Sequence, residues 1–228
     1  MKYLESFEKL NSDSRIYKEI TGANIRTIRD SLGIILLNYD MNAEDLRSIP
    51  HNIFFDLAIV PVWRDKEEGA EKLVVLSDAL CEQWEMSSED LLEMATGYSP
   101  DSSGFMFLKM SDYLNVVGPE SEEVVDMDMY ILSNRNMNYG SSALCYFGVL
   151  EDIREELGTG FFVFPANVHH MIVVPDHYPK ETQMLYNRSI NEVNLFTLPI
   201  SEFLSNGYYY YDADTKDIIL VDESAFAL

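Results

Sequence analysis

Apolar and polar residues in the first third of the chain follow the spacing of strands and short helices. Residues 31–40 are a predicted strand, and 41–50 are a predicted helix that ends at Pro50. In 52–63 both alternating faces are apolar, which is typical of a strand with neighbours on each side. Residues 72–76 are its predicted hairpin partner, so this region predicts a small antiparallel sheet.

Two helices and a loop are predicted next. Ser77 begins the first helix, and Ser87 begins the second, where Asp90 completes a capping box. Gly97 is the predicted end of the second helix, because glycine readily adopts the left-handed conformation that closes helices. Residues 98–122 are rich in turn-forming residues and are predicted to form a long loop between two lobes.

The second half of the chain has a clearer pattern. Residues 124–132 alternate, which predicts a strand with Asp126 and Asp128 facing solvent. Residues 141–158 are the strongest predicted helix, with an apolar stripe made of Ala143, Tyr146, Phe147, Leu150, Ile153 and Leu157. Two strands are predicted at 160–164 and 169–174, followed by a helix at 178–196 and a hairpin at 207–222.

This order of elements predicts an α+β fold with mostly antiparallel sheets flanked by amphipathic helices. The turn-rich middle segment favours two α+β lobes, 1–118 and 119–228. One continuous domain is the alternative.

The charge of the chain restricts its partners. The 228 residues carry a net charge of −23, of which residues 1–60 hold −2 and residues 61–228 hold −21. A field of this sign repels nucleic acids and anionic lipid head groups and attracts basic proteins. We therefore expect no direct binding of nucleic acid or membrane, and a solvated acidic surface is the simplest interpretation.

The N-terminal residues do not resemble a secretion signal, and the apolar runs are too short to span a bilayer. We therefore expect a cytoplasmic protein. Cys81 and Cys145 fall in predicted amphipathic helices, which favours reduced, packed thiols over a disulfide framework.

The adjacent histidines His169 and His170 are the most conspicuous candidates for chemistry. Neighbouring side chains on a strand point to opposite faces, which places His170 on the face of Ile172 and Val174 and His169 on the other face. The pair is therefore poorly placed to bind one metal ion. No paired cysteines supply further ligands. We expect no metal or cofactor, with one histidine packed through a hydrogen bond and the other facing water.

Two common enzyme motifs are missing from the sequence, although its many acid pairs leave acid–base chemistry open. It contains neither a G-x-S-x-G nucleophile elbow nor an H-E-x-x-H metal motif. Gly140, Ser141 and Ser142 begin a predicted helix, where capping is a simpler role than anion binding. These observations favour a protein that is not an enzyme.

Several motifs in the second half resemble a family of uncharacterised bacterial proteins, domain-of-unknown-function family 5688. They are Ser133-Asn134 at a strand end, Gly140-Ser141 after a turn, Tyr146 with Leu157 and Gly158 in a helix, and the segment 165–170, Pro-Ala-Asn-Val-His-His. The helices around Trp84, the strand at 52–63 and the tyrosine-rich hairpin are similar as well. The resemblance implies a shared fold over about 30–220 and no assigned activity.

The chain departs from the family pattern at the segment 165–170. Ala166 and Asn167 replace two serines, and His170 replaces a glutamate. If the family used a Ser/His/Glu site there, this chain has lost two parts of it, which weakens an enzymatic interpretation.

Three hypotheses of function remain, the last of which is a plain accessory domain whose acidity serves only solubility. The first is a non-catalytic acidic protein that engages a basic partner, for example as a nucleic-acid mimic that inhibits a DNA- or RNA-binding enzyme. Its expected binding residues are Glu120, Glu122, Glu123, Asp126 and Asp128. The alternative is an enzyme or small-ligand-binding protein with a pocket at adjoining strand and helix ends. Its expected residues are Asn134, Gly140, Tyr146 and His169.

Overall fold

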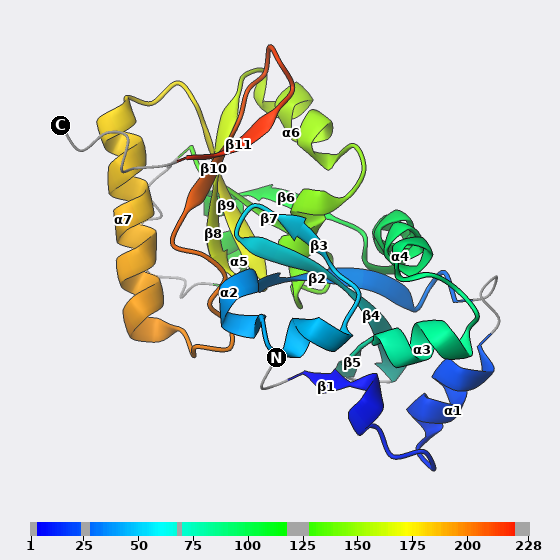
Figure 1. The fold of residues 1–228 in the computed structure, drawn as a ribbon. Coiled ribbons are helices and arrows are strands. Elements are labelled where there is room, and N and C mark those ends of the chain that lie inside the picture. The colour runs from blue at the N-terminus through cyan, green and yellow to red at the C-terminus, as the bar shows by residue number, and fades with distance from the viewer. Residues whose placement is uncertain (1–3, 24–27, 68–69, 118–127, 222–228) are drawn as a thin grey trace. The chain divides into compact units, whose positions relative to one another are not determined.

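The computed structural model describes residues 4–23, 28–67, 70–117 and 128–221 (Figure 1). Helices combine with two mostly antiparallel sheets, which confirms the predicted α+β class. The chain divides into two compact units: Met1–Gly104 with Cys145–Phe147, and Phe105–Leu144 with Gly148–Leu228. That 1–118 and 119–228 are separate domains stays a prediction.

Unit 1 contains a five-stranded sheet. Its strands are β1 (Glu5–Ser6), β2 (Leu32–Asn38), β3 (Asn52–Phe54), β4 (Leu57–Glu67) and β5 (Ala70–Val75). β4 pairs antiparallel with β2, β3 and β5, whereas β1 pairs parallel with β5. The single strand predicted at 52–63 is wrong, because the chain turns at Phe55, whose φ is 55°, and returns as β4.

In the described residues of unit 1, the chain forms four α-helices and two short 3₁₀ helices. They are α1 (Arg15–Gly22), α2 (Tyr39–Asn42), α3 (Asp78–Gln83) and α4 (Ser88–Ser103), with 3₁₀ turns at Phe7–Lys9 and Asp45–Ser48. The capping prediction for α4 is confirmed, since the Asp90 N–H donates to Ser87 Oγ at 3.0 Å. Its predicted end at Gly97 is wrong, because α4 continues to Ser103 and is capped by Gly104. Ser99, in the added turns, accepts the Ile34 N–H at 2.8 Å.

Unit 2 contains a six-stranded antiparallel sheet in the order β11-β10-β8-β9-β7-β6. Its strands are β6 (Met106–Lys109), β7 (Tyr130–Ser133), β8 (Phe161–Asn167), β9 (His170–Pro175), β10 (Tyr208–Tyr211) and β11 (Ile218–Val221). The loop predicted at 98–122 is wrong for its described part, because β6 pairs with β7 and leads directly into α5 (Met110–Val117). Residues 118–122 lie outside the described residues. The strand predicted at 124–132 is found only from Tyr130 onward in the described residues.

The single helix predicted at 141–158 is wrong, because the chain forms two separate helices there. A 3₁₀ helix, Gly140–Cys145, is separated from α6 (Val149–Leu157) by Gly148, whose φ of 82° lies in the left-handed region. The predicted apolar stripe is therefore broken: Phe147 is 97% exposed and Leu150 is half-buried. The predicted end of α6 at Gly158 is confirmed.

One face of the second sheet carries an aromatic core beneath α7 (Lys180–Thr197), which lies alongside β8 and β10 in Figure 1. The buried members of this core cluster are Met129, Phe162, Phe164, Val174 and Tyr208. From α7, Tyr186 and Ile190 pack against the cluster, which is the spacing of one helical turn. Gln183 and Asn187 are also buried on α7, so its inner surface is partly polar.

Candidate functional site

The turn between β8 and β9 separates the two adjacent histidines. His169 lies in the turn and His170 begins β9, so the prediction that both belong to one strand is wrong for His169. Asn167 Oδ1 accepts the backbone N–H groups of His169 at 2.8 Å and His170 at 3.1 Å. This Asx-type bonding fixes the turn.

One hydrogen bond to the ring of His169 and one to its backbone carbonyl hold this residue in place. The Tyr139 N–H donates to His169 Nδ1 at 3.1 Å, and Ser133 Oγ donates to the His169 carbonyl at 2.7 Å. His169 Nε2 lies 3.9 Å from Glu202 Oε2. Because Nδ1 accepts a hydrogen bond, a neutral His169 carries its proton on Nε2, facing Glu202. Its lone pair is therefore already used within the protein.

Asn134 and Gly140 lie close to His169. Asn134 is fully buried, donates to the Asn138 carbonyl at 2.8 Å and accepts the Asn138 N–H at 3.1 Å. A methyl group on Gly140 would lie 2.1 Å from Ser133 Oγ, 2.4 Å from Asn134 N and 2.8 Å from the His169 carbonyl oxygen. The residues are thus packed without space between them at this point.

The structure brings Asn134, Gly140 and His169 together, whereas the fourth residue of that predicted site, Tyr146, belongs to unit 1. Hydrogen bonds join Asn134 to Asn138 and hold His169 in the β8–β9 turn, while Gly140 is closely packed against the backbone of Asn134 and His169. The ligand site predicted at these residues stays a prediction.

His170 lies in different surroundings, because it lines a cavity of about 520 Å³ between α7 and the sheet. We call this cavity the α7 pocket. Its described lining consists of Met129, Ala166, Asn167, His170, Ile172, Tyr186, Ser189, Ile190, Val193, Asn194, Thr197 and Leu198. Small-molecule sites typically have volumes of roughly 300–1,000 Å³ and a mostly apolar lining with a few polar groups. The α7 pocket meets both conditions.

Polar groups in the α7 pocket lack partners within the described part of the protein. The imidazole of His170, the Nδ2 of Asn167 and the side-chain amide of Asn194 make no hydrogen bond there, in contrast to the His169 ring. Burial lowers the pKa of His170 to about 4, and the neighbouring His169 adds to the effect. His170 is therefore neutral at pH 7, with one nitrogen able to donate and the other able to accept.

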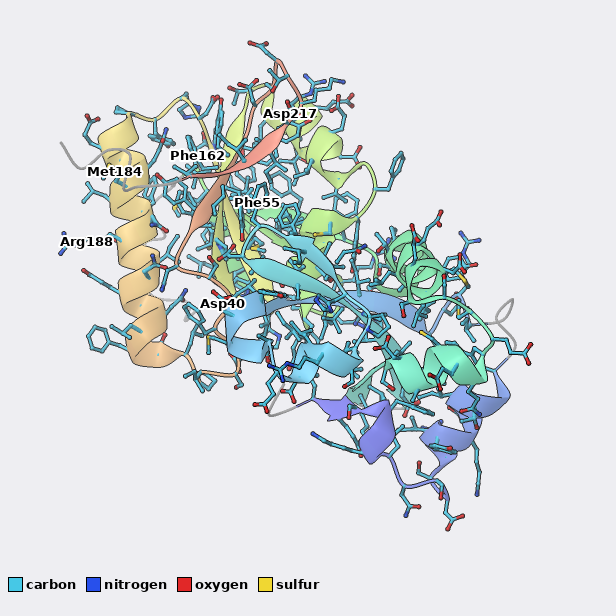
Figure 2. The ribbon with its side chains drawn as sticks, in the orientation of Figure 1. Asp40, Phe55, Phe162, Met184, Arg188 and Asp217 are labelled. Carbon is cyan, nitrogen blue, oxygen red and sulfur yellow. The ribbon has the colours of Figure 1, made fainter. Side chains whose placement is uncertain are left out.

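A larger hollow of about 870 Å³ lies on another flank of α7, with Met184, Leu185 and Leu195 in its lining. Figure 2 shows Arg188, from the same lining, pointing away from the sheet. Arg188 Nε donates to Glu192 at 3.0 Å, and Asn191 Nδ2 donates to the Asn206 carbonyl at 2.9 Å. Since these polar groups already have partners, the smaller α7 pocket is the better candidate site.

Of the five predicted acidic binding residues, Glu120, Glu122, Glu123 and Asp126 lie outside the described residues. Asp128 accepts a hydrogen bond from the Tyr130 hydroxyl at 3.2 Å and lies 3.3 Å from His177 Nε2. The hypothesis of a basic partner stays a prediction.

In the described ranges, no three His, Cys, Asp or Glu side chains are grouped so that they could hold a metal ion. Within the same ranges, no helix combines the length and apolar character that crossing a membrane requires.

Sequence reasoning placed His170 on the same strand face as Ile172 and Val174 but missed the pocket. The missing information was the position of α7, which supplies half of the lining. One signal was present: α7 has asparagine or serine at positions 187, 189, 191 and 194, so an apolar sheet face is covered by a partly polar helix. Such a mismatch is typical of a face that is not fully packed.

A model of a family of unknown function, DUF5688, matches residues 2–213 of the chain. No curated protein matches the chain, and no solved structure matches it.

Proposed function

Because the chain belongs to this family of unknown function, whose description names no activity, we propose a function from the chemistry of the α7 pocket: unit 2 binds a small, largely apolar molecule there without converting it. The observation that carries the proposal is the imidazole of His170. It lines an apolar cavity and has no hydrogen-bond partner in the described protein. A ligand that bonds to this imidazole supplies a partner that no described group of the protein provides.

Binding is favoured over catalysis by the properties of the same imidazole. A pKa of about 4 makes His170 a weak base near neutral pH, far from the value that suits proton transfer. The described pocket lining contains no cysteine or carboxylate, and its serine, Ser189, is exposed and forms no hydrogen bond with His170. An activated nucleophile needs such a bond to its base.

The test uses N-phenyl-1-naphthylamine, a neutral apolar fluorophore, as the probe. Saturable binding to the full chain is expected. Ser189→Trp places an indole at the pocket and should weaken binding at least about tenfold, since the added ring competes for the same space. Ser189 is exposed, so this change should leave the fold intact.

Leu185→Trp is the matched control. It adds an indole to the same helix at a residue that is 62% exposed and lies outside the α7 pocket lining. We expect it to bind the probe as the parent does. No saturable binding to the parent, or equal loss in both variants, would contradict the proposal.

A further inference from the structure

The α7 pocket has two chemically different ends. At one end, Met129, Ile172, Tyr186 and Ile190 extend the aromatic core cluster, and the Tyr186 ring lies 6.5 Å from that of Phe164. The other end lies toward the β8–β9 turn and is lined by Asn167 and His170. This turn is tied to the segment that follows α7, because the Val168 N–H donates to the Glu202 carbonyl at 3.0 Å.

The C-terminal half of α7 therefore lies beside the β8–β9 turn. It adds Asn194 and Thr197 to the polar end, whereas Tyr186 and Ile190, from earlier turns, line the apolar end. The hydrogen-bonding side chains of Asn167, His170, Asn194 and Thr197 thus gather toward the turn, whereas apolar residues continue along the whole lining. This arrangement matches a molecule with a polar head at the turn and an apolar tail.

The lining also restricts the charge of that head. None of the twelve lining residues that the structure describes is Asp, Glu, Lys or Arg. A charged head would lose hydration without gaining an opposite charge. The last carbonyl groups of α7 add a partial negative charge near the polar end, and the chain carries −23, so an anionic head is disfavoured further.

We infer that the α7 pocket selects an uncharged amphiphile, with an aliphatic or aromatic tail against the core cluster and a hydroxyl or amide head bonded to His170 and Asn167. A hydroxyl or primary amide both donates and accepts, and so it matches the unpaired imidazole and the Asn167 Nδ2 together. This inference rests on the proposed ligand-binding function and adds the chemical class of the ligand.

The test compares three molecules with the same eight-carbon chain: 1-octanol, octanoate and octylammonium. At pH 7.5 the first is neutral and the others carry opposite charges. Each is titrated against the full chain loaded with N-phenyl-1-naphthylamine, and displacement is read by fluorescence. We expect 1-octanol to displace the probe at a concentration at least about tenfold lower than either ion requires.

The two proposals fail in distinguishable ways. If the probe itself does not bind, the proposed function fails. If the probe binds but octanoate or octylammonium displaces it as well as 1-octanol does, the ligand-binding function stands and the uncharged class is overturned.

Variants of His170 test whether the polar head of the ligand bonds to this imidazole. His170→Leu keeps an apolar side chain of similar size but loses both ring nitrogens, so 1-octanol should bind about tenfold more weakly. His170→Asn keeps a donor and an acceptor and should recover part of the affinity. His177→Leu, which removes an exposed histidine of the same unit outside the pocket, should bind 1-octanol as the parent does. Unchanged 1-octanol affinity in folded His170→Leu would overturn the head assignment.

Discussion

On the His169 side of the β8–β9 turn, hydrogen bonds from Tyr139 and Ser133 and close packing around Gly140 hold the imidazole and its backbone. On the His170 side, one residue later, the imidazole faces a cavity of about 520 Å³ and has no partner in the described protein. His169 thus stabilises the turn, whereas the imidazole of His170 remains available for binding.

This difference arises from the backbone. Because Asn167 closes the turn, His169 stays outside the strand, and β9 begins at His170 with its side chain on the face that α7 covers. The His169 side should therefore control stability, and the His170 side should control binding and acid response. Each prediction below tests that separation.

The largest effect is expected at Gly140. In Gly140→Ala the new methyl group would lie 2.4 Å from a backbone nitrogen and 2.8 Å from a backbone oxygen, so the turn must shift. We expect the free energy of unfolding to fall by about 3 kcal/mol, measured by chemical denaturation.

The matched control is Gly97→Ala in α4, where an added methyl group meets no atom within 4 Å. Alanine favours a helix over glycine, so this variant should gain about 0.5–1 kcal/mol. Equal effects of the two substitutions would mean that the His169 side is not tightly packed.

The next effect concerns acid. Folding lowers the pKa of His170 from 6.5 to about 4, so between these values the unfolded chain binds a proton that the folded chain does not. The stability that the neutral His170 contributes is fully present above pH 6.5 and is lost as the pH falls toward 4. His170→Leu should reduce this loss by about 1–3 kcal/mol, measured as unfolding free energy at pH 7 and pH 4.

The titratable neighbours of His170 are the same in the parent and in the variant, so the comparison isolates the His170 ring. His169 and Tyr186 are the titratable groups identified beside it in the described structure, and His170→Leu leaves both in place. Identical pH dependence in the parent and His170→Leu would show that the ring is not held neutral by the pocket.

The smallest effects are expected from two serine variants, one on the His169 side of the β8–β9 turn and one on the His170 side. Ser133→Ala removes the bond to the His169 carbonyl and should lower the unfolding free energy by about 1 kcal/mol without changing binding of N-phenyl-1-naphthylamine. Ser189→Ala, in the pocket lining, should leave stability within about 0.5 kcal/mol of the parent. If Ser133→Ala weakens probe binding as much as it weakens the fold, the two sides are not independent.

Local patterns predicted the element types well where one residue type dictates the backbone. Ser87 with Asp90 gave the start of α4, and Gly158 gave the end of α6. The failures occurred where tertiary contacts overrode local signals: α4 continues past Gly97, where Ser99 bonds to β2, and β6 forms in a turn-rich segment because β7 pairs with it.

The candidate site was predictable only in part. Alternation placed His170 with Ile172 and Val174, but the prediction overlooked Asn167, whose side chain closes the turn and leaves His169 in it. The pocket itself depends on how a distant helix covers the sheet, and this position is set by packing, which a residue pattern does not contain.

The most direct test of the account follows the two imidazoles by NMR during one titration. The Cε1–Hε1 signals of His169 and His170, assigned with His169→Gln and His170→Leu, are recorded at pH 7.5 as N-phenyl-1-naphthylamine is added. The account predicts a saturable shift of the His170 signal and a much smaller shift of the His169 signal, because only His170 lines the α7 pocket. A saturable shift of His169 with His170 unmoved, or no shift of either, would contradict it.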